Sequence, residues 1–428
     1  TLHPFRVYRT LTLPPMKRTL IHNISRIEGI VAAGIQSLRG AEMAKMQSIE
    51  NGWLLIEGER IAAFGSSEEM QPENIDERID AARGLVLPSY CDSHSHLVFA
   101  CGRETEFEDR IKGLSYEEIA ERGGGILNSV DKMRSMSEEE LYERSKTRAW
   151  EAIRSGTGAL EIKSGYGLDT ESESKILRVA RRLGKELPIE VKTTFLGAHS
   201  FPREFQEDQD AYIDKIKNAM IPAIAAEGLA NYIDVFCERG YFDKVQMEEI
   251  LIAGIAHGMK VKVHVNQFSS IGGLQMALKH NALSVDHLEV MTEHDIEDLC
   301  ASETIATALP ACSFFINIPY APARQIIDKG GILALATDFN PGSSPCSNMN
   351  FIVSLACINM EMTPGEALAA STLNGAAAME LSEDLGSITI GKRANLIITR
   401  PMDSLSQIPY YFAKDPIGKI ILSGKVIA

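Results

Sequence analysis

The hydrophobic residues in the central part of the chain fall into short runs that alternate with amphipathic segments. Amphipathic helical patterns occupy residues 137–155, 169–186, 208–227, 243–258, 271–280, 292–302 and 322–329, and two further helical runs follow at 350–360 and 364–380. Eight apolar runs typical of buried strands lie at 85–92, 157–162, 189–197, 232–237, 260–265, 283–288, 304–310 and 332–338. Strands that alternate with helices pair in parallel through right-handed crossovers. Eight such units predict an α/β fold, a (β/α)8 TIM-type barrel over residues 85–381.

The two ends of the chain have a different pattern. Residues 50–88 and 386–428 contain short apolar runs separated by glycine, among them WLLIEGERIAAFG and GKIILSGKVIA, without long helices. Two β-rich segments on either side of one barrel predict a small composite β-sandwich domain built from residues 1–84 and 382–428. The run GSITIGKR nearly matches the phosphate loop G-x-x-x-x-G-K-[ST], but it ends in arginine and lies between strands, so nucleotide binding is not expected.

Composition narrows the class of protein. A length of 428 residues suits one large barrel with a small extra domain. The formal net charge of −15 disfavours binding to nucleic acid or to an anionic membrane surface. No apolar run approaches the roughly 20 residues that span a bilayer, and the first residues show no secretory signal. The seven cysteines include no C-x-x-C pair, which predicts reduced thiols in a cytoplasmic protein. Cys91 and Cys101 flank a histidine pair and are candidates for reactive thiols, although small buried side chains are the commoner role of free cysteine.

Histidines gather at the predicted strand ends. His94 and His96 share one face just past the first barrel strand, because side chains two residues apart in a strand point the same way. Strands three, five, six and eight end in His199, His264, His287 and Asp338. Active sites of α/β barrels lie at the carboxyl ends of the strands. Imidazoles with a carboxylate suit a zinc or iron ion that keeps a position for water, so we expect a catalytic metal site.

A second metal ion would need a bridging ligand. Lys163, if carboxylated, and Glu238 are the residues to consider, since a bridging ligand on strand four would imply two metal ions. Lys163 belongs to strand two, which is the wrong strand, and Glu238 follows strand four within the motif CERGYF. We therefore expect one divalent or trivalent metal ion per subunit.

These motifs resemble a known family. H-x-H on strand one, histidines on strands five and six and aspartate on strand eight look like the amidohydrolase superfamily, which typically adds a small β domain built from both termini. The longer segments HSHLVFACGRETEFEDRIKGLSYEEIAERGGGI, EIKSGYGLD, TFLGAHSFPREF, HVNQFSSIGG and ATDFNPGSSP are similar to the imidazolonepropionase family of that superfamily, which acts in histidine degradation.

The resemblance implies a role for each matching residue. His287 matches the metal-site histidine. The metal-ligand positions fall on His94, His96, His264 and Asp338, and the substrate-contacting positions fall on Arg103, Tyr166, His199, Gln267, Asn340, Gly342 and Ser343. The family also suggests a homodimer.

The implied reaction is hydrolysis of the cyclic amide 4-imidazolone-5-propanoate, a small molecule with a carboxylate tail, to N-formimidoyl-L-glutamate. Asp338 would carry a proton from water to the departing ring nitrogen. His287 would orient the attacking hydroxide, and His199 would hydrogen-bond the carbonyl oxygen. Arg103 offers a planar fork that suits the propanoate group.

Other interpretations remain open. A nucleobase or nucleoside aminohydrolase typically carries glutamate three residues after the strand-five histidine, and Gln267, which stands there, cannot exchange a proton at neutral pH. A barrel that serves as an assembly scaffold would be expected to lose metal ligands, and this chain keeps them all. Individually, Arg103 could be a salt-bridged loop residue, Tyr166 could pack in a loop, and His199 could be a structural hydrogen-bonding residue.

Overall fold

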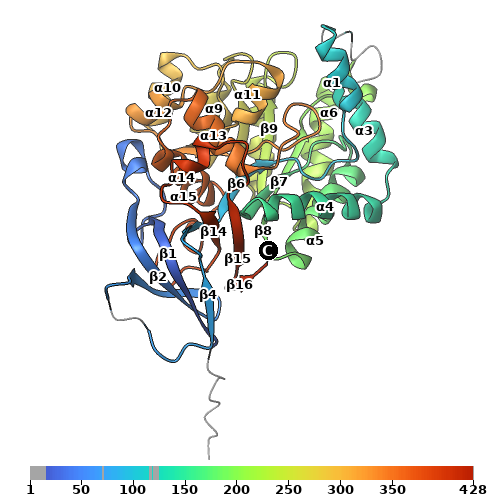
Figure 1. Cartoon of the computed structure of the whole chain (residues 1–428). Coiled ribbons are helices and arrows are strands. Elements are labelled where there is room, and N and C mark those ends of the chain that lie inside the picture. Colours follow the sequence, from blue (N-terminus) through green and yellow to red (C-terminus); the bar gives the residue numbers. More distant parts are fainter. Residues whose placement is uncertain (1–15, 70–71, 115–117, 119–124, 428) are drawn as a thin grey trace, which may run out of the picture.

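Two eight-stranded sheets organise the protein. The computed structural model describes residues 16–69, 72–114, 118 and 125–427 (Figure 1). The first 15 residues of the predicted β domain, and residues 115–117 and 119–124 of the longest family-like motif, lie outside the described residues. In the part of the chain that is described, no helix is long and apolar enough to cross a membrane.

The first sheet is the predicted barrel. Each strand pairs in parallel with the next one along the chain. The cylinder closes where Asp338 N donates to His94 O at 2.9 Å and His96 N donates to Phe339 O at 2.8 Å. The strands are β6 (Tyr90–Ser95), β7 (Thr157–Lys163), β8 (Glu190–Ala198), β9 (Tyr232–Cys237), β10 (Lys260–Val265), β11 (Ser284–His287), β12 (Ile305–Ala308) and β13 (Leu333–Leu335).

Helices surround this barrel on the outside. Several begin at side-chain caps: Ser137, Asp169, Thr292 and Thr363 each accept a backbone N–H of the first turn. The predicted helices correspond to α4 (Glu138–Arg154), α5 (Thr170–Glu186), α8 (Lys244–Ala256), α9 (Gly273–Lys279), α10 (Glu293–Cys300), α12 (Ala323–Asp328) and α13 (Met349–Asn359).

Two predicted helical runs are divided. Residues 208–227 form α6 (Gln209–Lys215), a π-helical turn (Ile216–Met220) and α7 (Ile221–Ala226), and residues 364–380 form α14 (Pro364–Ser371) and α15 (Leu373–Ala377). Other helices were not predicted: α1 (Glu104–Ile111), α3 (Gly125–Ser135), α11 (Pro310–Ile316), α16 (Gln407–Tyr410), and 3-10 turns at Gly40–Lys45 and Arg203–Phe205.

The second sheet joins both ends of the chain, as the blue and red strands of Figure 1 show. Its order is β16-β15-β14-β5-β1-β2-β3, with β4 beside β1. An isoleucine-rich core that includes Ile21, Ile24 and Ile27 lies against it, which supports the predicted small sandwich. The strands are β1 (Arg18–Ile30), β2 (Gln47–Glu57), β3 (Arg60–Ser66), β4 (Glu77–Asp80), β5 (Gly84–Pro88), β14 (Leu396–Pro401), β15 (Ile417–Leu422) and β16 (Lys425–Val426).

The predicted strand 85–92 is in fact two strands in different sheets. Its first half lies in β5, which pairs antiparallel with β14, and its second half lies in β6, which starts the barrel. Both strands are buried throughout, so the run GLVLPSY reads as one continuous apolar strand. The change of sheet at Ser89 connects the terminal sheet directly to the strand that carries His94.

Candidate active site

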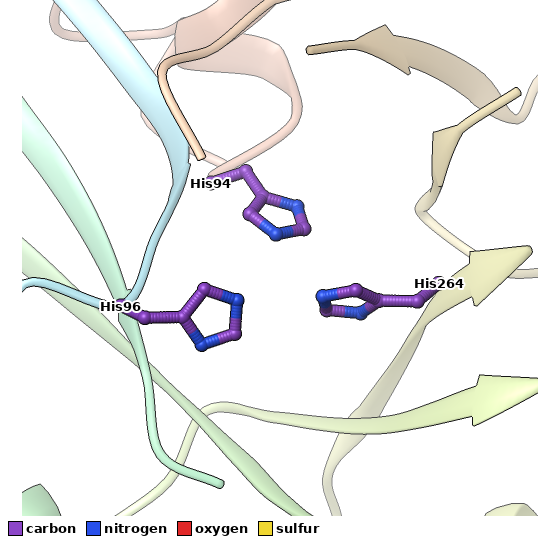
Figure 2. Close-up of side chains that lie close together, drawn as sticks. All are labelled: His94, His96 and His264. Carbon is purple, nitrogen blue, oxygen red and sulfur yellow. The ribbon is translucent and has the colours of Figure 1, made fainter. Parts of the chain in front are cut away.

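Three imidazoles converge at the carboxyl end of the barrel. Figure 2 shows the rings of His94, His96 and His264 pointing toward one another. The ring centroids of His94 and His264 lie 4.5 Å apart, and those of His94 and His96 lie 5.3 Å apart. One nitrogen from each ring lies within 4.8 Å of the other two. All three residues are at most 2% exposed, so the cluster is shielded from bulk water.

Asp338 and His287 complete this cluster. Asp338 Oδ1 lies 3.5 Å from His94 Nε2 and 3.6 Å from His96 Nε2. His94, His287 and Asp338 also form a group whose ligand atoms lie within 4.8 Å of one another. The backbone of His287 (φ 88°) and of Asp338 (φ 51°) is left-handed, which is uncommon for such residues and often marks functional sites. The strand ends therefore hold these two side chains in constrained positions.

The hydrogen bonds around the imidazoles suit a metal ion. His94 Nδ1 donates to Asp286 Oδ2 at 2.7 Å, and His264 Nδ1 donates to Asp234 Oδ2 at 2.9 Å. These bonds leave a lone pair on each Nε2, and both Nε2 atoms are buried without a hydrogen-bond partner among the described residues. Buried polar atoms are rarely left unsatisfied. A cation between the rings would satisfy them, in the carboxylate–histidine–metal arrangement common in metalloenzymes.

Burial also keeps the imidazoles in the form that binds metal. It lowers the pKa of His94 and of His96 well below the usual value, and the positive charge of Lys163 adds to the effect. Both rings are therefore neutral at pH 7, as a metal ligand must be. The site can hold a divalent metal ion.

A buried network of charges lies beneath the cluster. Lys163 Nζ lies 2.7 Å from Glu161 Oε1, 2.8 Å from Asp234 Oδ2 and 3.3 Å from Asp286 Oδ2. Lys262 pairs with the other oxygen of Glu161. All five side chains are fully buried. Burial lowers the pKa of Lys163, but the three carboxylates outweigh it and hold that pKa above its usual value. Lys163 thus links the two carboxylates that orient His94 and His264.

Neither candidate for a bridging ligand joins the cluster. Lys163 is engaged in this network, and Glu238 Oε2 accepts the backbone N–H groups of Phe268 and Ser269 at 2.9 and 3.1 Å. Within the described ranges, Glu238 is absent from the groups of His, Cys, Asp and Glu side chains that could hold a metal ion.

A line of side chains leads outward from the metal cluster. The ring of His199 stacks on that of His96, with centroids 5.3 Å apart and planes 10° apart. Tyr166 meets His199 edge-on at 5.5 Å, and the guanidinium carbon of Arg103 lies 6.0 Å from the centroid of Tyr166. A Cβ on Gly342 would lie 2.6 Å from Arg103 Nη1. Glycine at that position therefore leaves the space that the guanidinium group occupies.

The hydrogen bond of His199 changes its expected role. Its Nδ1 donates to the carbonyl oxygen of Gly165 at 3.0 Å. Burial, together with the neighbouring His264, lowers the pKa of His199 to about 3. The neutral ring thus carries its proton on Nδ1, and Nε2 is an acceptor. The expected donation from His199 to a substrate carbonyl would require the protonated ring, which this environment disfavours.

The turn after β13 is organised by Asn340. Its Oδ1 accepts the backbone N–H groups of Gly342 and Ser343 at 2.8 and 2.7 Å, and its Nδ2 donates to Asp338 O at 2.6 Å. Ser343 Oγ lies 3.4 Å from Asp338 Oδ2. The amide of Asn340 is therefore used to shape the turn that holds Ser343 beside Asp338. Gln267, across the site, donates to Cys312 Sγ at 3.4 Å.

Comparison with known proteins decides the family. The model of the amidohydrolase family matches residues 85–427.

The chain belongs to the amidohydrolase family.

Similar curated relatives within this family are imidazolonepropionases. The protein from Flavobacterium johnsoniae is 55% identical over 409 residues and the alignment covers 96% of this chain and 100% of that protein. The protein from Christiangramia forsetii is 53% identical and the alignment covers 95% and 99% of the two chains. Similarity at this level indicates a hydrolase and favours the predicted family over the aminohydrolase alternative.

Solved structures of more distant amidohydrolase-fold proteins confirm the fold. The triazine hydrolase from Arthobacter aurescens superposes with a TM-score of 0.72 at 15% identity, covering 96% of this chain and 94% of that one. An adenosine deaminase from Xanthomonas campestris, solved with bound zinc, gives 0.71 at 15% identity, covering 96% and 93%. At this identity the likeness concerns the fold alone.

A cavity lies beside the segment that follows Asp338. It has a volume of about 660 Å³, and its lining includes Arg103, Arg144, Arg148, Phe339 and Pro341 but none of the predicted metal ligands. Arg103 thus belongs both to this cavity and to the line of side chains that ends at His96. Three arginines and two glutamates, Glu104 and Glu151, line the cavity, so its charged lining is positive by one and suits an anionic molecule.

Sequence reasoning missed the buried charge network, of which it named only Lys163, and that as a candidate bridging ligand. Asp234 and Asp286 lie inside the strand runs YIDVFC and LSVDHL, and Glu161, Lys163 and Lys262 lie inside neighbouring strands. Charged side chains are almost never fully buried unless they are paired. An aspartate within an otherwise apolar barrel strand was therefore the available signal.

Proposed function

We propose that this chain hydrolyses the cyclic amide bond of 4-imidazolone-5-propanoate and releases N-formimidoyl-L-glutamate, as an imidazolonepropionase of histidine degradation. One observation carries the proposal: 55% identity to an imidazolonepropionase over almost the full length of both chains. The position of Arg103 supports it, because its guanidinium group ends the line of side chains that runs through Tyr166 and His199 to His96, and it suits a substrate with a carboxylate tail. Gln267 in place of a proton-carrying glutamate argues against deamination.

One metal ion, zinc or iron, would be held by His94, His96, His264 and Asp338. Such an ion, when bound, lowers the pKa of water to roughly 7 and polarises the amide carbonyl. The donor set of three neutral imidazoles and one carboxylate suits either metal. The fold neighbour that was solved with bound zinc is in keeping with a divalent metal ion at this site.

Asp338 carries the proton in the proposed reaction. Its carboxylate accepts the proton of the attacking water and delivers it to the ring nitrogen when the C–N bond breaks. Burial raises the pKa of Asp338, although His287 and His264 lower it in part. A raised pKa brings the carboxyl group closer to the value at which it can both accept and donate near neutral pH. Ser343, held by the Asn340 turn, steadies the second oxygen.

His287 orients the attacking water. Burial alone would lower the pKa of its ring, but Glu289 and Cys312 lie beside it and hold that pKa well above the usual value. His287 Nδ1 faces Glu289 Oε1 at 3.2 Å. The ring is therefore a hydrogen-bond donor that the carboxylate of Glu289 holds in place.

The remaining residues position the substrate. Arg103 binds the propanoate group, and Tyr166 donates its hydroxyl to the same end of the molecule. His199 Nε2, as an acceptor, receives an N–H of the imidazolone ring. Gln267 contacts the opposite edge of the ring, and the turn that contains Gly342 closes over the tail.

The test is a coupled assay. Urocanase generates 4-imidazolone-5-propanoate from urocanate, the metal-loaded protein is added, and the loss of the ring's ultraviolet absorbance is followed. We expect rapid loss with the wild-type chain and none with Asp338→Asn. Arg103→Met should raise KM about 10- to 100-fold, the value of a charge-assisted hydrogen bond of about 1.5–3 kcal/mol, while Arg178→Met on the outer face of α5 leaves KM unchanged. No loss of absorbance with metal-loaded wild-type protein would overturn the assigned substrate.

We also propose that the enzyme works in the cytoplasm as a homodimer. All seven cysteines are unpaired thiols, as is usual in a reducing compartment. Burial raises the pKa of the Cys91 thiol to about 12, so this thiol is unreactive at neutral pH. The dimer rests on the family resemblance, and light scattering on purified protein tests it.

A further inference from the structure

A second group of metal-ligating side chains lies next to the proposed catalytic centre. His287 ends β11, Glu289 follows it by two residues, and Cys312 lies in the first turn of α11. One ligand atom from each lies within 4.8 Å of the other two. The three residues are 3%, 6% and 0% exposed, respectively. This cluster shares no residue with the set proposed to hold the catalytic metal.

The carboxylate of Glu289 is incompletely satisfied. Its Oε1 faces His287 Nδ1 at 3.2 Å and Ser313 Oγ at 3.4 Å. Its Oε2 is buried without a hydrogen-bond partner among the described residues. A buried carboxylate oxygen without a donor is costly, because it has lost water and gained nothing in return. A bound cation is one group that would satisfy it.

We propose that His287, Glu289 and Cys312 form a second, weaker cation site that takes a soft divalent ion such as Zn²⁺ or Cd²⁺. Thiolate and imidazole ligands select soft metals over Mg²⁺ and Ca²⁺, and three protein ligands leave a position for water. When the ion binds, the Cys312 thiol and the protonated His287 ring each release a proton to solvent, and a metal–sulfur bond and a metal–nitrogen bond form. Because this site offers three protein ligands and the proposed catalytic site offers four, the second site fills after the catalytic one.

Occupancy of this site withdraws His287 from the proposed catalytic centre. A ring that ligates the second ion no longer orients the attacking water, so excess soft metal inhibits the enzyme and a chelator reverses the inhibition. The inhibition rests on the proposed function, whereas the binding itself does not.

Titration of the metal-free full chain with Cd²⁺ tests the site, since a cadmium–thiolate bond has an ultraviolet charge-transfer band and the four proposed catalytic ligands include no sulfur. We expect the first equivalent to bind without the band and a second equivalent to produce it. Cys312→Ala should still bind the first equivalent of Cd²⁺. It should not bind the second equivalent, and the charge-transfer band should be absent. Cys237→Ala, which removes a buried cysteine of β9, should keep both.

Cys312→Ser keeps the volume of the side chain and replaces the alanine variant if that one fails to fold. Glu289→Gln should weaken binding of the second equivalent about 10-fold or more and leave the first unchanged. A band that persists in Cys312→Ala, or the absence of a band in the wild type at millimolar Cd²⁺, would overturn the proposal. Failure of the urocanase-coupled assay would instead refute the assigned substrate and leave the titration result intact.

Discussion

The substitution Asp286→Asn tests whether the carboxylates beneath the cluster prepare the imidazoles for metal. Asp286 Oδ2 accepts from His94 Nδ1 at 2.7 Å, and Asp286 Oδ1 accepts from Ser284 Oγ at 2.6 Å. Asparagine keeps the size of the side chain but removes the charge and offers only one accepting oxygen. His94 is then free to carry its proton on either nitrogen, and the local negative charge that attracts a cation decreases.

Both effects weaken metal binding, so Asp286→Asn should lower the affinity of the site for the metal ion. Loss of a histidine's hydrogen-bonding partner typically weakens metal affinity 10- to 100-fold, which corresponds to about 1.4–2.8 kcal/mol. The free energy of unfolding of the metal-free protein should change less than when Lys163 is removed, because Lys163 keeps Glu161 and Asp234 as partners.

Competition for Zn²⁺ between the metal-free protein and a chromophoric chelator measures this affinity. Glu366→Gln is the matched control, since Glu366 is a buried carboxylate that caps α14 and pairs with Arg324. We expect wild-type affinity for Glu366→Gln and the stated loss for Asp286→Asn. If Asp286→Asn folds and binds Zn²⁺ as tightly as the wild type, the inference that Asp286 prepares His94 is wrong.

Further expectations concern other buried groups. Lys163→Met removes the ammonium group that three buried carboxylates share, and guanidinium unfolding of the metal-free protein should show a loss of about 3–5 kcal/mol in the free energy of unfolding. Burial lowers the pKa of Lys392 from 10.5 to about 8. Between about pH 8 and pH 10.5 the unfolded chain therefore binds more protons than the folded one. The free energy of unfolding consequently rises with pH across this range through Lys392. Lys392→Met should flatten that rise in thermal melts, and a slope equal to that of the wild type would contradict the pKa assignment. In ¹⁵N NMR spectra at pH 6, His199 should be neutral with its proton on Nδ1; a protonated ring would refute its role as acceptor.

The sequence predicted the barrel well because buried parallel strands and amphipathic helices have different periods. It failed where that signal is ambiguous: β5 and β6 read as one apolar run, although Pro88 ends the first and Tyr90 begins the second. The helix α1 was missed because its sequence ETEFEDRI has only two apolar side chains and buries no residue. The helix α11 was missed because PACSFFI directly follows a strand and is short.

The sequence located the cluster of histidines but not the hydrogen bonds and ion pairs that surround it. Histidines at strand ends are visible because the ends of parallel strands meet at one rim. The donation from His199 to Gly165 was not predictable, because it depends on how two loops meet. The pairing of Lys163 with Asp234 and Asp286 was equally hidden, since inward and outward positions of strands buried on both faces look alike in sequence.

The closure of the barrel has a consequence for biosynthesis. The seam between β6 and the segment after β13 is fastened by bonds such as Thr337 N to Asp92 Oδ1, which join residues 245 positions apart in the chain. His94 and His96 lie on one side of this seam and Asp338 lies on the other. A nascent chain still on the ribosome therefore possesses the histidines long before it acquires the aspartate. A chain that terminates before residue 337 lacks these closing bonds and lacks Asp338, so it cannot assemble the four proposed metal ligands. Binding of the metal ion at this site therefore requires a chain that has been synthesised past β13.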